Sequence, residues 1–197
     1  RNWVLTDLGT VDGFIGTEAS IAGGFDNINA ILGKVRTALD PGTDSLTGLD
    51  APATWNINAT GLQYTSGGRT LDFSNIENLI GGSDDDSFVF AAGAVLPGDN
   101  NSIAGKSGTD TLDYSAYITP VEVYLQGGIA TGTTGGVSSI ENVIGSILAA
   151  NIIHGDDNAN VLVSGSTNDT LIGYGGNDTY VFDSDNPLGL DTVDEQT

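Results

Sequence analysis

Apolar residues recur every nine positions near the C-terminal end of the chain. Residues 146–181 divide into four consecutive blocks, SILAANIIH, GDDNANVLV, SGSTNDTLI and GYGGNDTYV. The eighth position of every block is apolar: Ile153, Leu162, Leu171 and Tyr180. A nine-residue unit with one inward apolar residue cannot bury that residue alone, whereas stacked units can. The pattern therefore predicts short strands that stack on one another, with the apolar residues forming an internal column.

The sixth position of each block carries an amide or a carboxylate. The residues there are Asn151, Asn160, Asp169 and Asp178. Three upstream blocks follow the same rule, because LDPGTDSLT (39–47), GGSDDDSFV (81–89) and GKSGTDTLD (105–113) place Asp44, Asp86 and Asp110 at the sixth position. Asp and Asn favour turns, so we expect these side chains to project from the turns between strands.

A longer repeat surrounds the nine-residue pattern. TDSLTGLDAPATWNI (43–57) aligns with TDTLDYSAYITPVEV (109–123), and FSNIENLIGGS (73–83) aligns with VSSIENVIGS (137–146). We therefore divide one continuous structure into four units: residues 1–42, 43–108, 109–145 and 146–197. The first unit is partial, so we expect the chain to be a segment of a longer repetitive protein.

Stacking of the nine-residue blocks predicts the register of the strands. If two blocks make one flattened coil, equivalent residues lie 18 positions apart. Asn151 then lies beside Asp169, and Asn160 lies beside Asp178 on the opposite edge. The sequence therefore predicts an all-β fold, a parallel β-solenoid whose longer units form wider, irregular coils.

Local patterns add three strands and one helix to this expectation. Residues 54–57, 121–125 and 180–182 are short runs rich in β-branched or aromatic residues, bounded by turn-forming residues, and are expected strands. Apolar residues at helical spacing predict one short helix over Ile28–Leu39, which Pro41 would end.

The composition excludes several classes of partner and metal site. The chain has 26 acidic and 5 basic residues, a formal net charge of −21, no cysteine and one histidine. Such a charge repels nucleic acid and anionic membrane surfaces and attracts cations. Disulfides and thiolate metal sites are excluded, and zinc lacks its usual ligands. No apolar run reaches 18 residues, so we expect no membrane insertion.

The blocks GYGGNDTYV, GKSGTDTLD and GGSDDDSFV resemble the nonapeptide of RTX, or haemolysin-type, calcium-binding repeats. The resemblance implies a right-handed parallel β-roll, with Ca²⁺ held in the turns by Asp carboxylates and by backbone carbonyls of the glycine-rich segments. It also implies a secreted or cell-surface bacterial protein. The metal ligands that it implies here are Asp169, Asp178, Gly173, Gly175, Gly176, Asp110, Asp86, Asp84, Asn160 and Asn151.

Calcium chemistry suits these residues. Ca²⁺ prefers six to eight oxygen ligands, and glycine allows backbone carbonyls to point into a tight turn. Two of the four C-terminal blocks depart from the motif, however, because they carry Asn151 and Asn160 instead of an acid. An Asn column can stack through side-chain hydrogen bonds without metal, and Asp84–Asp86 can equally be a solvated loop.

We therefore expect a non-enzymatic, calcium-binding structural segment, such as a spacer, filament or adhesin stalk. Partners other than calcium would be copies of the chain stacked end to end, or a cell surface or glycan. One alternative is a module of a calcium-dependent polysaccharide lyase or epimerase, although no Lys or Arg pairs with a Tyr in a recognisable motif. Another alternative is a metal-free adhesion or ligand-binding solenoid.

Overall fold

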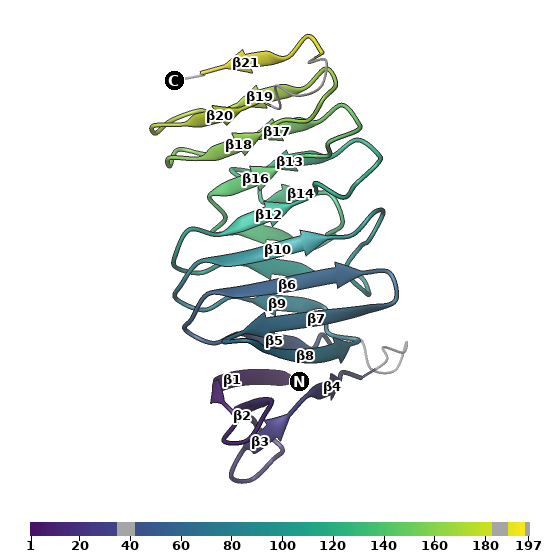
Figure 1. Ribbon diagram of the computed structural model, residues 1–197, viewed down its shortest axis with the longest axis vertical. Coiled ribbons are helices and arrows are strands. Elements are labelled where there is room, and N and C mark those ends of the chain that lie inside the picture. Colours follow the sequence, from purple (N-terminus) through teal and green to yellow (C-terminus); the bar gives the residue numbers. More distant parts are fainter. Residues whose placement is uncertain (35–41, 183–188, 196–197) are drawn as a thin grey trace.

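The computed structural model of the protein describes residues 1–34, 42–182 and 189–195. Every regular element among these residues is a strand, and the strands stack one above another along the long axis of the molecule (Figure 1). The N-terminal strands form one end of this stack and the C-terminal strands form the other. The described strands make three sheets, each with two separate edge strands, so none of the three closes into a barrel.

The first sheet has the order β15-β11-β9-β5-β1-β2-β3. Its strands are β1 (Asn2–Leu8), β2 (Phe14–Glu18), β3 (Phe25–Ile28), β5 (Ser45–Thr47), β9 (Asn78–Ile80), β11 (Ser102–Ala104) and β15 (Gly136–Ser138). Neighbours from β1 to β15 are parallel, whereas β2 and β3 add two antiparallel strands at the N-terminal end.

The second sheet has the order β20-β18-β16-β12-β10-β6-β7-β8-β4. Its strands are β4 (Ala30–Leu32), β6 (Ala53–Asn58), β7 (Gly61–Ser66), β8 (Arg69–Ser74), β10 (Asp86–Phe90), β12 (Thr111–Asp113), β16 (Asn142–Ile144), β18 (Val161–Val163) and β20 (Thr179–Val181). Strands β6, β7 and β8 form an antiparallel meander, and the neighbours from β6 to β20 are parallel.

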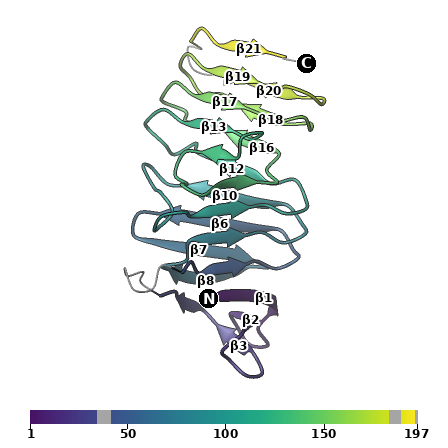
Figure 2. The ribbon, with the colours of Figure 1, turned by 180° about the vertical axis from the view of Figure 1, so that it is seen from behind.

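The third sheet lies at the C-terminal end and has the order β14-β13-β17-β19-β21 (Figure 2). Its strands are β13 (Glu122–Tyr124), β14 (Ile129–Ala130), β17 (Ile152–His154), β19 (Thr170–Ile172) and β21 (Thr192–Asp194). Strand β14 is antiparallel to β13, and the other neighbours are parallel. The chain alternates between the second and third sheets from β16 to β21, which places one sheet on each side of the interior.

The predicted 18-residue register is confirmed in the C-terminal region. Ile153 pairs with Leu171 in the third sheet, and Leu162 pairs with Tyr180 in the second sheet. The expected strands at 54–57, 121–125 and 180–182 correspond to β6, β13 and β20, and each bound differs by one residue.

The core consists of columns of paired apolar side chains. In most three-residue strands the middle residue is buried and its two neighbours are partly exposed, so each strand turns one side chain inward. The column of the second sheet is Trp55, Phe88, Leu112, Val143 and Leu162, all fully buried. Burial of one such side chain stabilises the fold by roughly 1.5–3 kcal/mol. A single block cannot bury its apolar residue, so this stabilisation is gained only when blocks stack.

The two long units also share a structural relationship. Strand β5 follows Asp44 and pairs with β9, whereas β12 follows Asp110 and pairs with β16. In both units the Glu of the Ile-Glu-Asn segment accepts a hydrogen bond from the backbone N–H of the Asp: Glu77 from Asp44 at 2.7 Å and Glu141 from Asp110 at 2.8 Å. The sequence repeat therefore corresponds to a repeated contact, although the two units occupy different sheets.

The helix predicted over Ile28–Leu39 is wrong where the structure describes this segment. Ala30–Leu32 is strand β4, and Ile31 pairs with Phe73 of β8. Only Ile31 is buried, which is the alternation of a strand rather than the stripe of a helix. Residues 35–39 lie outside the described residues. The described part of the chain contains no helix able to cross a membrane.

Close stacking of the turns makes some glycines indispensable. A Cβ on Gly82 would lie 1.8 Å from the carbonyl oxygen of Leu49, whereas a Cβ on Gly61 would have no neighbour within 4 Å. We expect Gly82→Ala to lower the free energy of unfolding by about 1–3 kcal/mol, the usual cost of forcing an atom into a packed site. The matched variant Gly61→Ala should change it by less than about 1 kcal/mol. Urea denaturation measures both, and equal stability of the two variants would contradict this account of the turns.

Candidate metal centre

Polar residues at the sixth position, with Glu141 and Asp191 at equivalent places, form hydrogen-bonded columns in the second and third sheets, which we together call the acceptor ladder. Each member directly precedes a strand or, like Asp86, begins one. Five side chains accept a hydrogen bond from the backbone N–H of the equivalent residue on the neighbouring, earlier strand. The bonds are Asp86 to Asp110 (2.8 Å), Asp110 to Glu141 (2.8 Å), Asn151 to Asp169 (2.6 Å), Asn160 to Asp178 (2.8 Å) and Asp169 to Asp191 (2.9 Å), donor first. The ladder explains why these positions are polar although they face the interior.

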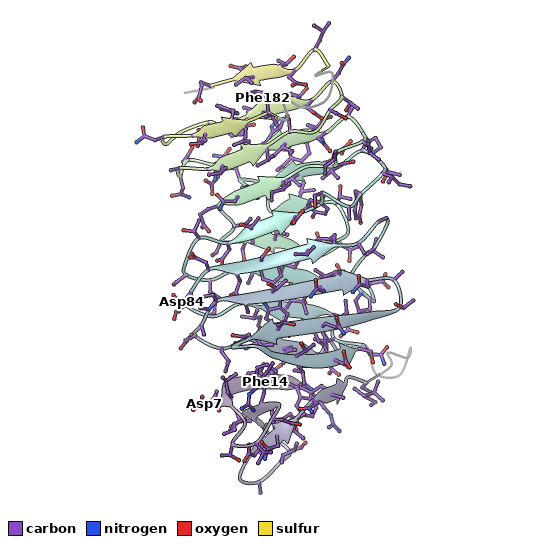
Figure 3. The ribbon with its side chains drawn as sticks, in the orientation of Figure 1. Asp7, Phe14, Asp84 and Phe182 are labelled. Carbon is purple, nitrogen blue, oxygen red and sulfur yellow. The ribbon has the colours of Figure 1, made fainter. Side chains whose placement is uncertain are left out.

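The structure places most of the predicted metal ligands in this ladder. Asp86, Asp110, Asn160 and Asp178 belong to the second sheet, and Asn151 and Asp169 belong to the third. Asp169 and Asp178 therefore lie on opposite sides of the interior, as the 18-residue register predicts. All of these side chains except Asp178 are almost completely buried. Asp84 is different, because it is exposed and projects from the edge of the molecule (Figure 3).

One group of turns donates a backbone N–H of the turn itself to the side chain of its ladder residue, although Asp86 Oδ1 in this group is buried and has no hydrogen-bond partner. In the segments 81–86, 155–160 and 164–169, the backbone N–H four residues before the ladder residue donates to its side chain. These bonds are Gly82 to Asp86 Oδ2 (2.8 Å), Asp156 to Asn160 Oδ1 (2.8 Å) and Gly165 to Asp169 Oδ2 (3.0 Å). We call these segments closed turns. In Asp169 each carboxylate oxygen accepts a donor, because Oδ1 takes the backbone N–H and side-chain amide of Asn151.

Two segments, 105–110 and 173–178, lack that bond, and we call them open turns. The residue four positions before the acid is in the left-handed region in both, with φ of 84° at Lys106 and 70° at Tyr174. Asp110 Oδ2 and Asp178 Oδ2 are buried and have no hydrogen-bond partner in the structure. Each open turn thus presents one inward carboxylate oxygen that nothing described in the protein satisfies.

Backbone oxygens of neighbouring turns lie close to these carboxylates. A Cβ on Gly105 would lie 2.3 Å from Asp110 Oδ2 and 2.0 Å from the carbonyl oxygen of Ser139, so both oxygens crowd the same glycine. A Cβ on Gly173 would lie 2.1 Å from Asp178 Oδ2 and 2.4 Å from the Tyr180 hydroxyl. The first position of an open turn must therefore be glycine, and a hard cation would find oxygen atoms around it.

The other predicted glycines shape the open turn from outside. Gly176 has a φ of 99°, and a Cβ there would lie 2.5 Å from the carbonyl oxygen of Asn158 in the adjacent closed turn. Gly175 lies beside Asp157 of the same closed turn at ordinary contact distance. Both residues bring the two turns together, and their carbonyl groups are available as candidate ligands.

The electrostatics of Asp110 favour a neutralising partner. Burial, together with the charges of Asp86, Glu141 and Asp85, raises the pKa of the Asp110 carboxyl to about 7, although the hydrogen bond from the Asp86 N–H acts in the opposite direction. Burial also raises the pKa of Asp86, to about 6, although the Gly82 N–H and the Trp55 side chain act in the opposite direction. A buried carboxyl surrounded by other carboxyls takes up a proton or a cation.

The candidate ligands are oxygen donors of the type that calcium prefers, but each open turn contains few charged side chains. Within the described residues, no three His, Cys, Asp or Glu side chains gather into a group that could hold a metal ion. A site at an open turn would therefore combine one ladder carboxylate with main-chain carbonyls, as the donor set of a hard cation allows. No protein-family model and no curated protein matches the chain, so the resemblance to RTX repeats rests on the motif itself.

Sequence reasoning missed four residues that matter to this site. Glu141 and Asp191 complete the ladder, and Lys106 and Tyr174 define the open turns. The alignment of the two Ile-Glu-Asn segments contained the signal for Glu141. No pattern of side-chain types indicates a left-handed Lys or Tyr.

A pair of amide substitutions separates the two kinds of turn. Asp110→Asn keeps an acceptor for the Asp86 N–H and removes a buried charge, so we expect it to stabilise the metal-free protein at pH 8. Asp169→Asn instead places an amide group against a backbone N–H that donates, so we expect it to destabilise the protein by about 1–3 kcal/mol. Urea denaturation in a calcium-free chelating buffer measures both. Destabilisation by both variants to the same extent would contradict the distinction between open and closed turns.

The raised pKa of Asp110 also predicts a pH dependence. Its pKa of about 7 in the folded protein exceeds the ordinary value of 3.8, so folding favours the protonated carboxyl. The stability that this group contributes is complete below about pH 4 and is lost as the pH rises through about 7. The metal-free protein should therefore lose stability between pH 5 and pH 8, and Asp110→Asn should flatten this slope. An unchanged slope in the variant would exclude Asp110 as its source.

Proposed function

We propose that the chain is a calcium-stabilised structural segment of a secreted or cell-surface bacterial protein, built as a right-handed parallel β-solenoid. The observation that carries the proposal is the set of buried carboxylate oxygens without a hydrogen-bond partner: Asp110 Oδ2 and Asp178 Oδ2 at the open turns, and Asp86 Oδ1 at the closed turn that neighbours Asp110. The segment has no catalytic role in this proposal, and it serves as a spacer, filament unit or adhesin stalk.

The strand pairing supports a solenoid. Parallel neighbours with the 18-residue register of Ile153 and Leu171, and of Leu162 and Tyr180, alternate between two sheets on either side of one interior. Each full path through one strand of each sheet then makes one coil, and the next coil stacks upon it. Such stacking gives an elongated, stiff segment whose stability depends on contacts between adjacent coils.

The agreement between the motif and the geometry supports calcium at the open turns. Among the blocks that carry an acid at the sixth position, LDPGTDSLT has glycine at the fourth position alone, whereas GKSGTDTLD and GYGGNDTYV have glycine at both the first and the fourth positions, as the RTX motif requires. These same two blocks form the open turns, with Gly108 and Gly176 at φ of 117° and 99°. The closed turns of Asp86 and Asp169 instead donate a backbone N–H to the Oδ2 atom of the acid, and of these two acids only Asp169 has donors on both oxygens.

Calcium would supply positive charge where the ladder places buried negative charge. At the first open turn Asp110 and the Ser139 carbonyl would hold the ion, and at the second Asp178 would hold it with carbonyls of Gly173, Gly175 or Gly176. Because Asp110 and Asp178 also accept a hydrogen bond from the neighbouring strand, an ion there would strengthen the contact between coils. Folding then gains free energy from calcium concentrations of the extracellular medium, roughly 10⁻³ M.

Thermal unfolding with and without calcium tests this function. We expect calcium, but not magnesium, to stabilise the protein by about 2.7 kcal/mol when its free concentration is a hundred times the dissociation constant. Asp178→Asn should remove part of this stabilisation, and combination with Asp110→Asn should remove nearly all of it. Asp157→Asn, which changes an exposed acid beside the second open turn, should leave it intact.

Three results would contradict the proposal. Equal stabilisation by calcium and magnesium, or an equal loss in Asp157→Asn, would assign the effect to diffuse screening of the −21 charge. If calcium at roughly 10⁻² M, ten times the extracellular level, does not stabilise the protein against thermal unfolding, the calcium sites are excluded and a metal-free solenoid is the remaining interpretation.

A further inference from the structure

The conformation of one residue separates the open turns from the closed turns. In the closed turns this residue is Gly82, Asp156 or Gly165, none of which is left-handed, and each donates its N–H to the ladder side chain. Lys106 and Tyr174 occupy the same place in the open turns and are left-handed, and the Oδ2 atom of the acid that follows has no donor. Whatever keeps this residue left-handed therefore keeps a carboxylate oxygen free.

A left-handed backbone is unfavourable for a tyrosine. In this conformation the Cβ atom approaches the following carbonyl oxygen, a contact that glycine avoids because it has no Cβ. Tyr174 has a φ of 70°, so contacts elsewhere in the molecule must hold it there.

His154 supplies such a contact. Nδ1 of His154 and the Tyr174 hydroxyl are joined by a hydrogen bond of 3.0 Å, and the two ring centroids lie 5.8 Å apart, edge to face. His154 belongs to β17, which lies between β13 and β19 in the third sheet (Figure 2). The ring of His154 also lies 4.6 Å from that of Tyr124, its register partner in β13. The second open turn is thus anchored to two earlier strands.

The first open turn has no such anchor. Lys106 is exposed, and within the described residues its side chain forms no hydrogen bond or ion pair. Lys106 also places a positive charge on the turn that carries Asp110, whereas Tyr174 is uncharged. Because Lys106 is left-handed without an anchor, the anchor at Tyr174 raises the population of the open turn rather than creating it.

We infer that His154 is a positioning residue, which holds Tyr174 left-handed and thereby keeps the Asp178 carboxylate open to a cation. A site that is ordered before the ion arrives binds it more tightly than a site that binding must order. The second open turn should therefore be the tighter of the two proposed calcium sites. The conformation of the turn is a property of the metal-free protein, whereas this order of affinities rests on the proposed function.

Nuclear magnetic resonance of the isotope-labelled protein in EDTA tests the conformation, because the Cα and Cβ chemical shifts of residue 174 report the sign of φ. We expect left-handed shifts in the wild type and in the control Tyr124→Phe, which removes a hydroxyl from the neighbouring ring. Tyr174→Phe and His154→Ala should move the shifts toward the values of a negative φ, because each removes the anchoring hydrogen bond. Unchanged shifts in both variants, or an equal change in Tyr124→Phe, would overturn the inference.

Calorimetric titration with calcium tests the order of affinities. Asp110→Asn leaves only the second open turn and Asp178→Asn leaves only the first, and we expect the calcium dissociation constant to be roughly tenfold lower in Asp110→Asn. Addition of Tyr174→Phe to Asp110→Asn should raise that constant roughly threefold to tenfold, the effect of one hydrogen bond. Tyr174→Gly in the same background should keep it within about threefold of the parent, because glycine adopts the left-handed conformation without an anchor.

Failure of the inference and failure of the proposed function give different results. If neither Asp110→Asn nor Asp178→Asn binds calcium, the proposed function is wrong, and the chemical shifts of residue 174 alone decide whether His154 positions the turn. Tighter binding by Asp178→Asn than by Asp110→Asn, or no weakening by Tyr174→Phe, would contradict the inferred order of affinities. Circular dichroism confirms that each variant is folded.

Discussion

The fold depends on a backbone N–H that ordinary strand pairing does not satisfy. Where a turn enters a short parallel strand, the N–H of the entering residue points toward the neighbouring strand, and burial would make it costly to leave without a partner. The side chain of the equivalent residue on that strand accepts it, as Asp110 does for Asp86. This bond fixes the register, because a shift of one residue would place an apolar side chain at the N–H and a carboxylate in the core.

Several residue types can occupy the ladder positions, but their charges have different consequences for stability. Asn160 accepts the Asp156 N–H and donates its amide to the Glu141 carbonyl, so it satisfies the ladder without charge. Asp169 satisfies the ladder with a charge that several donors stabilise. At Asp110 one oxygen remains without a donor, and the charge is a cost that a proton or a cation removes. A proposed calcium site is therefore a local variation on a ladder that holds the strands together elsewhere without metal.

The sequence predicted what strict periodicity determines. The 18-residue register, the inward Leu171 and the polar column follow from a repeat in which one position must be buried and another must accept a hydrogen bond. Conformation that depends on tertiary contacts was not predictable. Apolar spacing at Ile31 suggested a helix, but pairing with β8 determines a strand there. Asp169 and Asp178 share the context Asn-Asp-Thr, and they differ because the backbone four residues earlier differs: Gly165 donates to the carboxylate, whereas Tyr174 is left-handed.

The ladder also explains why the two edges of the molecule differ so strongly in chemistry. Position six of each block must carry a hydrogen-bonding Asp or Asn and position eight must be apolar, so both positions are constrained by the fold. The outward residues of the turns meet neither constraint, and there the chain places Asp84 and Asp85 on one edge but Ile118 and Leu148 on the other. Because stacked turns align equivalent positions, a few substitutions repeated along one edge produce a continuous surface rather than scattered patches. A fold of this kind can therefore carry different chemistry on each of its edges without altering the columns that hold its strands together.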